Sequence, residues 1–447
     1  PGNVGSATAA TGFNVDNSCR FDGSSSYLQK TYASGQNKTF SISTWIKRSS
    51  VGDAGAIWSG YHNATNYLTL AFKDDDALRF QNVSAGVNMN FTTNRLFRDV
   101  SAWMHILAIV DTTDGTAGDR QQIFINGVRE TSFSTSTAYA EDAAAELGAT
   151  DKENIVGRHG SGDDYFDGYM AEHVFIDGLA LAADQFGEFD SDNGIWKPID
   201  VSGLTFGTNG YYLDFKASGN LGNDANGGTD LSENGLAATD QSTDTCTNNF
   251  ATWNPLACAM QNVGNNVTFS EGNLKAVGTS GGEGTLLSTM AVNSGKWYAE
   301  FKMIDVADGN FSQVALLEED AALKTTGGTG ATVSRGNVTV KPNGDLFIAE
   351  TRSQSWGPTF TDNDIIQIAA DLDNGAFYFG KNGTYSNSGN PESGASKTGA
   401  AYAFTASSKL WFFAGGLNGT GSAVEANFGS PSFAISSGNT DGNGYGN

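Results

Sequence analysis

The chain contains little proline, cysteine or positive charge. Its 447 residues include 7 Pro and 3 Cys, and only 25 Lys and Arg stand against 49 Asp and Glu. The resulting net charge of −24 argues against a nucleic-acid-binding protein, which needs a basic surface to meet the phosphates. No run approaches the roughly 20 apolar residues of a membrane-spanning helix, so we expect no membrane span.

A disulfide framework usually has an even number of cysteines, whereas this chain has three, Cys19, Cys246 and Cys258. Cys246 and Cys258 could close a short loop, or all three could be indifferent thiols. No spacing of cysteine and histidine matches a zinc site.

Glycine, in contrast, is abundant. The 57 Gly keep no three-residue period, which excludes a collagen-like chain. With 39% hydrophobic and 11% aromatic residues the chain can build real cores, which argues against disorder. These features indicate an acidic, turn-rich globular protein of the all-β class, with two or three domains for its length.

Hydrophobic residues alternate with polar ones in several runs, which is typical of half-buried antiparallel strands. The clearest runs are residues 40–46, 104–110 and 297–303. Asn126-Gly127 predicts a tight hairpin, since both residues tolerate the positive φ of a type I′ turn. Asp373-Asn374-Gly375 predicts a second hairpin in the same way.

Residues 218–249 are rich in Gly, Asn, Asp, Ser and Thr and hold few apolar side chains. This composition predicts a loop and linker. We therefore expect a first domain over residues 1–217, a linker over 218–249, and a second domain over 250–447.

The first half resembles laminin G-like jelly-roll domains, which are concanavalin A-like, and especially those in tail and fibre proteins of marine bacteriophages. The resemblance covers some 200 residues and rests on segments in a fixed order. These are Arg20-Phe21-Asp22-Gly23 with Tyr27-Leu28, residues 40–48, Phe97-Arg98-Asp99 with residues 102–105, residues 123–128, residues 167–172 with Phe175-Ile176-Asp177-Gly178, and residues 207–215.

The second half is similar to SPRY domains, which are also concanavalin-like sandwiches. The segments that carry this likeness are residues 247–250 with Trp253-Asn254-Pro255-Leu256, residues 295–300, the hairpin over residues 371–383, and Asn427-Phe428-Gly429. Chains with this pairing often continue past a Gly/Asn-rich tail, so we expect that Asn447 need not be the encoded end.

Together the resemblances imply two tandem concanavalin A-like antiparallel β-sandwiches, or jelly rolls, in a phage virion structural protein. The expected role is attachment to the host through a tail fibre, spike or capsid fibre that recognises a surface glycan or envelope component without catalysis. Its partners would be other virion proteins on the particle surface, and a homotrimer is expected by analogy with phage fibres. The alternatives are a purely structural decoration or spacer protein with no host ligand, and a polysaccharide-degrading glycosidase.

The glycosidase alternative needs a pair of carboxylates on one strand. The nearest stretch is residues 188–193, Glu-Phe-Asp-Ser-Asp-Asn, which lacks the second Glu of the laminarinase pattern and lies in a glycine-flanked turn. It is interpreted as an acidic surface loop, so the protein is expected not to be an enzyme. His105, in a strand pattern beside Trp103, is interpreted as a structural histidine.

Calcium is the one metal that the resemblance implies, because laminin G-like domains sometimes bind it at the sandwich rim. A Ca²⁺ ion takes about six to eight oxygen ligands, so clustered Asp in glycine-rich loops are its candidates. Asp163, Asp164 and Asp167 form one such cluster. The triplet Asp74-Asp75-Asp76 forms another, although a hairpin turn favours Asp there for backbone reasons alone.

Glycan binding would use exposed aromatic rings beside polar side chains. Tyr61, His62 and Asn63 in a predicted loop form one candidate group, and Trp356 between Ser355 and Gly357 is another. Each could equally be a loop anchor buried against a sheet edge.

Overall fold

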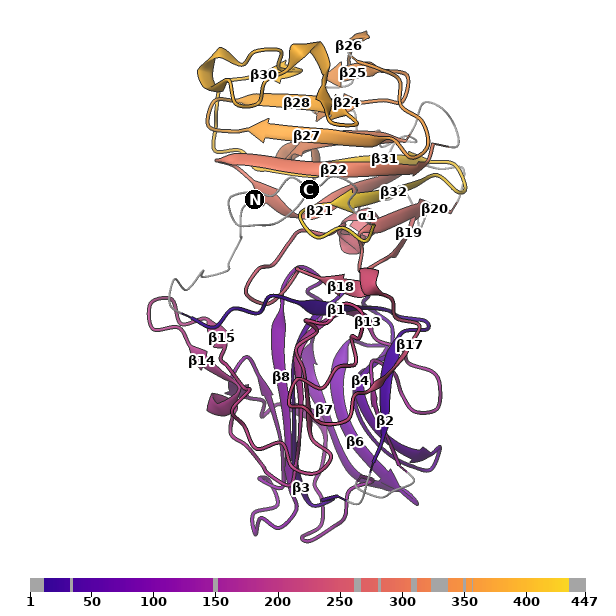
Figure 1. The fold of residues 1–447 in the computed structure, drawn as a ribbon, viewed down its shortest axis with the longest axis vertical. Helices are drawn as coiled ribbons and strands as arrows, with labels where there is room; N and C mark the ends of the chain where they lie inside the picture. Colours follow the sequence, from indigo (N-terminus) through magenta and orange to yellow (C-terminus); the bar gives the residue numbers. More distant parts are fainter. Residues whose placement is uncertain are drawn as a thin grey trace. The chain divides into compact units, whose positions relative to one another are not determined.

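The computed structural model separates the chain into two compact units, Gly5–Asn249 and Phe250–Asn447, which we call the first and second domains. It describes residues 12–32, 35–147, 152–260, 267–279, 283–306, 312–322, 337–348, 351–355 and 357–433. Both domains are built of antiparallel strands (Figure 1). Helices in these ranges are short, and none is long and apolar enough to cross a membrane. They are η1 (Ala183–Gln185), η2 (Ala238–Asp240), α1 (Pro255–Met260), α2 (Glu319–Ala322), η3 (Ser386–Ser388) and η4 (Gly394–Ser396).

The first domain contains two large sheets, which we call sheet A and sheet B. Sheet A has the order β10 (Val128–Arg129), β9 (Gln121–Ile125), β8 (Met104–Asp111), β3 (Thr39–Arg48), β13 (Asp167–Asp177), β1 (Ser18–Asp22) and β18 (Gln241–Ser242), with β16 (Tyr211–Leu213) also paired to β13. Sheet B has the order β11 (Phe133–Thr137), β7 (Val87–Leu96), β6 (Ala77–Ser84), β5 (Asn66–Phe72), β4 (Gly55–Asn63), β12 (Glu153–Val156), β2 (Tyr27–Thr31) and β17 (Ser232–Asn234). A small ribbon pairs β14 (Gly187–Phe189) with β15 (Trp196–Pro198).

The main core of the first domain lies between sheets A and B. Phe40, Ile42 and Ile46 of β3 are fully buried in it, together with Trp58 of β4 and Phe175 of β13. The indole of Trp58 stacks on the ring of Phe175 with 5.7 Å between ring centroids. The alternation over residues 40–46 and 104–110 therefore did indicate strands, now seen as β3 and β8.

The predicted hairpin at Asn126-Gly127 is confirmed. Both residues have positive φ, 48° and 75°, and they join β9 to β10 in antiparallel register. This is the backbone geometry that matches the twist of paired strands, which is why Asn-Gly signals it.

Sheet A also has a second apolar cluster on the face away from the main core. Trp45, Leu107 and Val174 point into this cluster and pack against Phe186, Trp196 and Phe206 from the segment between β13 and β16. Both faces of sheet A are therefore covered, whereas sheet B has an outer face that carries polar and aromatic side chains.

Residues 218–249, expected as a linker, are part of the first domain. Their strands β17 and β18 pair with β2 and β1, and Leu221 and Leu231 are buried in the main core. The polar composition of the segment does not reveal these two buried leucines, nor its backbone hydrogen bonds to strands more than 200 residues earlier in the chain.

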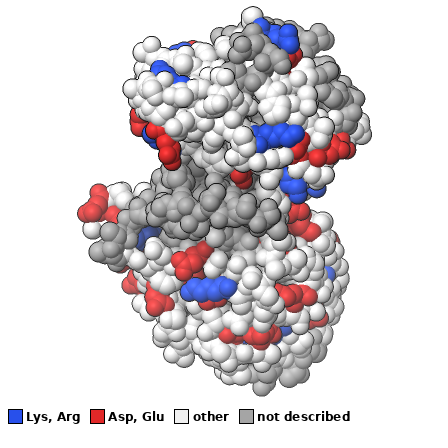
Figure 2. Space-filling model, turned by 45° about the horizontal axis from the view of Figure 1, so that its top comes forward, with Lys and Arg blue, Asp and Glu red and all other residues white. Residues whose placement is uncertain are grey.

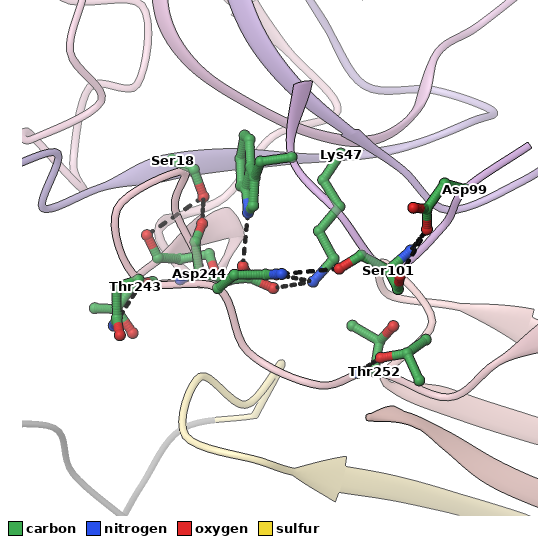
Figure 3. Close-up of polar contacts among 12 residues, drawn as sticks. Ser18, Lys47, Asp99, Ser101, Thr243, Asp244 and Thr252 are labelled. Atoms are coloured by element: carbon green, nitrogen blue, oxygen red, sulfur yellow. Dashed lines mark hydrogen bonds and ion pairs between the residues drawn. The ribbon is translucent and has the colours of Figure 1, made fainter. Parts of the chain in front are cut away.

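A buried ion pair also fixes this segment. The Nζ of Lys47 lies 2.8 Å from Asp244 Oδ2 and donates to Asn249 Oδ1 at 2.8 Å (Figure 3). The indole of Trp103 donates to Asp244 Oδ1 at 2.9 Å, and the Ser18 hydroxyl donates to the Asp244 carbonyl at 2.6 Å. Lys47 and Asp244 are almost completely buried, so each charge depends on the other.

The second domain contains two further sheets. One has the order β19 (Val267–Ser270), β20 (Lys275–Gly278), β32 (Ala423–Asn427), β22 (Lys296–Asp305), β27 (Ile365–Asp371), β28 (Ala376–Lys381) and β29 (Thr384–Tyr385), with β30 (Tyr402–Ala403) paired to β28. The other has the order β21 (Glu283–Val292), β31 (Trp411–Asn418), β23 (Gln313–Glu318), β24 (Asn337–Val340), β25 (Asp345–Ile348) and β26 (Thr351–Ser355). Trp253, Phe301 and Phe413 belong to the core of this domain.

Two sequence predictions in the second domain are confirmed. In β22, Ala299, Phe301 and Met303 are buried while the residues between them are half-buried, as the alternation indicates. The hairpin at Asp373-Asn374-Gly375 joins β27 to β28, and Gly375 has a φ of 72°.

Acidic side chains do not gather in one patch on the face seen in Figure 2. They are spread over that face in small groups, several of which lie beside Lys or Arg. The charge of −24 therefore does not by itself mark a binding site there.

Candidate functional site

The candidate site is the outer face of sheet B, over strands that run side by side in Figure 1. On β5, Leu68 and Leu70 point into the core. Because side chains alternate along a strand, Tyr67 and Thr69 point to the other side. The pattern of β5 thus places one tyrosine and one threonine on the outer face.

The strand register extends this face across the sheet. Tyr67 lies opposite Tyr61 of β4, and Thr69 lies opposite Gln81 of β6 and Ser59 of β4. Tyr61 and Tyr67 are half-buried, whereas Thr69 and Ser59 are fully buried beneath their larger neighbours. This face therefore has the buried hydroxyl side chains of Thr69 and Ser59 next to the phenol rings of Tyr61 and Tyr67, with the Gln81 side chain on the neighbouring strand.

The connection from β12 to β13 adds further rings to the site. The His159 ring meets the Tyr67 ring edge-on at 4.8 Å and the Tyr61 ring at 6.0 Å between centroids. Gly160 lies against the Tyr61 ring so closely that a Cβ at this position would collide with it. A glycine is therefore needed at 160 for the connection to approach the strand.

An arginine is stacked on two tyrosines at the same face. The Arg158 guanidinium lies 3.8 Å from the Tyr27 ring centroid and 5.8 Å from that of Tyr165. The two tyrosine rings meet edge-on at 6.2 Å. This arrangement holds the guanidinium plane in place through cation–π contacts.

The charged groups around His159 act in opposite directions. Burial lowers the pKa of His159 below its usual range, the carboxylates of Asp163 and Asp164 act against that change, and the charge of Arg79 adds to it. Asp163 accepts a hydrogen bond from Ser161 Oγ, which lowers the pKa of its carboxyl. His159 is therefore held neutral near pH 7 and presents an uncharged ring to the site.

The predicted glycan residues are placed differently from one another. The loop predicted at residues 61–63 is wrong, because they form the end of strand β4. Tyr61 faces the site, and His62 is exposed at the following position. The Asn63 side-chain oxygen accepts hydrogen bonds from the Thr65 backbone, the Thr65 hydroxyl and the Asn66 amide at 2.9–3.0 Å, so it builds the turn to β5. Trp356 lies outside the described residues.

The predicted calcium residues do not meet at one point. Asp163 faces His159 and Ser161, and the Asp164 carbonyl accepts the Ala56 amide at 2.8 Å. Asp167 lies on β13 of sheet A, opposite Asp22. In the part of the chain that the structure describes, no three His, Cys, Asp or Glu are grouped to hold a metal ion. These residues therefore do not fit a shared calcium site.

The aspartate triplet at 74–76 forms the turn between β5 and β6, as its alternative interpretation states. Asp76 is buried there, 3.1 Å from Arg48 Nη1 and 2.7 Å from Arg98 Nε. Its carboxylate joins two arginines rather than a cation.

Glu188, Asp190 and His105, the residues considered for catalysis in the sequence, each contact other side chains of the fold. Glu188 and Asp190 lie 3.2 and 3.5 Å from the Nζ of Lys197 across the β14–β15 ribbon. His105 is completely buried, with Nε2 at 2.8 Å from Ser43 Oγ and Nδ1 accepting the Trp196 indole at 3.2 Å. Burial lowers the pKa of His105 to about 3, so the ring is neutral.

Tyr27, Tyr67, Arg79 and Arg158 were not among the predicted site residues. Tyr67 and Arg79 could have been predicted from the sequence, because apolar and polar residues alternate clearly over the hairpin of residues 66–84. This alternation places both side chains on the face opposite to that of Leu68 and Leu70, which point into the core. Arg158 and Tyr27 come together only through the pairing of β2 with β12.

Residues 22–185 match the laminin G family model described as the "Concanavalin A-like lectin/glucanases superfamily". The matched range lies inside the first domain, which is a concanavalin A-like laminin G sandwich. The all-β prediction is confirmed. A search of the curated proteins found no match to this chain.

Solved structures similar to this chain include a SPRY domain, a pentraxin and a laminin fragment. The SPRY domain of human HERC1 is 18% identical, with 39% of this chain and 96% of that chain covered and a TM-score of 0.28. The heptameric SAP-like pentraxin of Limulus polyphemus is 16% identical, covering 45% and 93%, with a TM-score of 0.32. Domains LG4-5 of the mouse laminin alpha1 chain are 10% identical, covering 95% and 92%, with a TM-score of 0.32.

Proposed function

We propose that the first domain binds carbohydrate on the outer face of sheet B and does not cleave it. The observation that carries the proposal is the set of half-buried rings of Tyr27, Tyr61 and Tyr67 on this face, where the Tyr67 hydroxyl lies 3.5 Å from the side-chain oxygen of the buried Gln81. Sugar rings offer apolar C–H faces edged with hydroxyl groups. They are therefore complementary to phenol rings with hydrogen-bonding side chains next to them.

The carboxylates on this face support binding over hydrolysis. Glycoside hydrolysis uses two carboxyl groups that flank the scissile bond. At the outward positions of the described strands β2, β12, β4, β5, β6 and β7, Glu153 supplies the one carboxylate. In the connection above them, Asp163 is hydrogen-bonded to Ser161.

The setting belongs to the same proposal. The order of the laminin G-like and SPRY-like segments supports a protein of the bacteriophage virion surface, in a tail fibre, spike or capsid fibre, that attaches to a host glycan. Labelling intact particles with an antibody against this chain tests the setting: signal at the exposed tips of tail fibres, spikes or capsid fibres supports attachment, and signal only at the capsid shell, away from any fibre tip, contradicts it.

Replacing Tyr61 or Tyr67 by alanine is expected to weaken glycan binding roughly five- to thirty-fold, the effect of removing a ring at the centre of a contact. The full chain is first applied to a glycan array, and the dissociation constant of the best ligand is then measured by calorimetry for each variant. Tyr298→Ala is the matched control, because this tyrosine is also half-buried but belongs to the second domain.

Circular dichroism and the melting temperature show whether each variant is folded. If no glycan binds the folded chain, or if Tyr61→Ala and Tyr67→Ala bind as tightly as Tyr298→Ala, the proposal is wrong. The first of these outcomes would favour the spacer role.

A further inference from the structure

Lys47 of β3 lies between a carboxylate and a carboxamide. Its Nζ is 2.8 Å from Asp244 Oδ2 and donates a hydrogen bond to Asn249 Oδ1, also at 2.8 Å (Figure 3). Among the lysines that the structure describes, Lys47 is the one that is buried, with its side chain 1% exposed. The Asp244 side chain is 3% exposed, and Asn249 is half-buried. An amine, an amide carbon and a proton acceptor therefore meet at one place within the first domain.

Neighbouring groups hold the carboxamide and the carboxylate in this arrangement. Asn249 Nδ2 donates to the Ser101 carbonyl at 2.8 Å, so the carboxamide presents its oxygen, rather than its NH2 group, to Lys47. The indole of Trp103 donates to Asp244 Oδ1 at 2.9 Å, and Oδ2 faces Nζ. Because Oδ1 is bonded to Cγ, the Asn249 Cγ lies no more than about 4 Å from the amine nitrogen. This is close to the separation of about 3–3.5 Å from which a bond forms.

We propose that Lys47 and Asn249 form an intramolecular isopeptide bond after the first domain has folded. The lone pair of Nζ attacks Asn249 Cγ, the Nζ–Cγ bond forms, and the Cγ–Nδ2 bond breaks with its electrons remaining on Nδ2. Asp244 carries two protons in turn from Nζ to Nδ2, which departs as an ammonium ion, and Asp244 is ionised again at the end. Atoms and charge balance without a further reactant.

The surroundings favour this reaction at Lys47 over the exposed lysine pairs. A lysine amine is a nucleophile only without its extra proton, and a site shielded from water disfavours the charged forms of amine and carboxylate alike. The rings of Trp103 and Tyr169 border the site, with Nζ 5.8 Å from the Tyr169 ring centroid. Lys38 and Lys296 are also paired with carboxylates, but their side chains are 41% and 55% exposed, so water solvates their ammonium groups.

The bond joins β3, which has paired strands on both sides in sheet A, to the last residue of the first domain. Lys47 and Asn249 are 202 residues apart in the sequence, so the crosslink closes a long loop and restricts the unfolded chain. A force that pulls on the second domain reaches the first domain through residue 249, and the bond passes it directly to β3. The segment over residues 218–249 is then held in the fold under load, whether or not the protein binds carbohydrate.

Mass spectrometry of the denatured full chain tests the proposal directly. We expect the folded wild type, after incubation at neutral pH, to be lighter than its sequence by one ammonia. Trypsin should then release Thr39–Arg48, uncleaved after Lys47, as a branched peptide joined through Asn249 to residues 217–275. The branched peptide distinguishes the crosslink from ammonia lost at an Asn-Gly sequence elsewhere in the chain.

Asn249→Ala removes the amide carbon and should abolish both the mass loss and the branched peptide. Its melting temperature should fall by roughly 10–20 °C, because the unfolded chain regains the freedom that a crosslink of this span removes. This variant keeps Lys47 beside Asp244, so it is also the uncrosslinked background in which that ion pair is measured. Asn248→Ala is the matched control: Asn248 Nδ2 donates to the Thr243 carbonyl at 3.3 Å, and the variant should keep the bond.

Asp244→Asn should slow bond formation at least about a hundredfold, as expected when a proton carrier is removed. Formation as fast as in the wild type overturns the step assigned to Asp244. The wild-type mass decides the proposal even if a variant does not fold. A folded wild type with the unchanged mass of its sequence, or a branched peptide that joins Lys47 to Asp244 with loss of one water, overturns it.

Discussion

Replacing Asp244 by alanine should lower the free energy of unfolding of the first domain by about 3–5 kcal/mol. The change removes the Asp244 carboxylate from beside the Lys47 ammonium, whose side chain is 1% exposed. The indole N–H of Trp103 loses its acceptor as well. An uncompensated charge inside a protein costs far more than the contact between two paired charges contributes.

Urea unfolding followed by tryptophan fluorescence measures the effect, and a matched ion pair at the surface provides the control. Asp142 lies 3.0 Å from the Nζ of Lys38, but their side chains are 66% and 41% exposed. Lys38→Ala, which removes this pair without touching Asp142 and its φ of 60°, is therefore expected to change stability by less than about 1 kcal/mol. Equal losses in the two variants would contradict the structural role given to the buried pair.

A double variant, Lys47→Met with Asp244→Leu, distinguishes the lost charge partner from lost packing. It removes both charges and keeps apolar volume, so it should lose less stability than Asp244→Ala alone. A double variant at least as unstable as the single one would indicate that packing around residue 244 dominates.

Much of the strand content could be predicted from the sequence because its signals are local. Phe40, Ile42 and Ile46 alternate over one run, and Asn126-Gly127 specifies the backbone geometry of its own turn. Strand alternation and turn geometry depend on residues that are neighbours in the chain, so both are still present in the folded protein.

Segment 218–249 shows where local signals fail. Its composition is that of a loop, yet Ser242 pairs with Ser18, and Asp244 meets a lysine 197 residues earlier. Two apolar residues, Leu221 and Leu231, are enough to anchor it in the core. Composition averages over the segment and therefore cannot reveal contacts that individual residues make with distant strands.

The candidate site divides in the same way. The sequence predicts Tyr61 as an aromatic residue next to polar ones, and the fold places it on the outer face of sheet B. The prediction of Asp163, Asp164 and Asp167 as a calcium site depends on their closeness in sequence. Asp167, however, lies on a strand of the other sheet, so that proximity does not become a shared site. The stack of Arg158 on Tyr27 depends on strand pairing that composition and spacing do not specify.

Glu172 should make the first domain less stable as the pH rises from about 4.5 to about 7. Burial raises the pKa of this carboxyl from about 4.5 to about 7, against the hydrogen bond that the Tyr212 hydroxyl donates to its Oε2 at 2.6 Å. Glu172 also has a φ of 48° at the irregular register between Ala171 and Val174, so β13 holds it there despite an unfavourable backbone conformation.

The sign of this effect follows from proton counting. Between about pH 4.5 and 7 the folded domain keeps a proton on Glu172 that the unfolded chain releases, so stability falls as the pH rises through this window. A shift of this size corresponds to about 3 kcal/mol in full. Asp167, whose pKa burial and Asp22 raise to about 7, acts in the same direction. His105 and His173, whose pKa values burial lowers to about 3, act in the opposite direction below about pH 6.5.

Glu172→Gln isolates the contribution of this one residue, because glutamine keeps the shape and stays neutral at every pH. The difference in unfolding free energy between the variant and the wild type should be small at pH 5. It should grow to as much as about 3 kcal/mol in favour of the variant at pH 8. Asp167→Asn, measured alone and combined with Glu172→Gln, shows whether the two carboxyls add independently. Urea unfolding at half-unit steps of pH measures each difference, and a difference that is the same at pH 5 and pH 8 would show that Glu172 is ionised in the folded domain throughout.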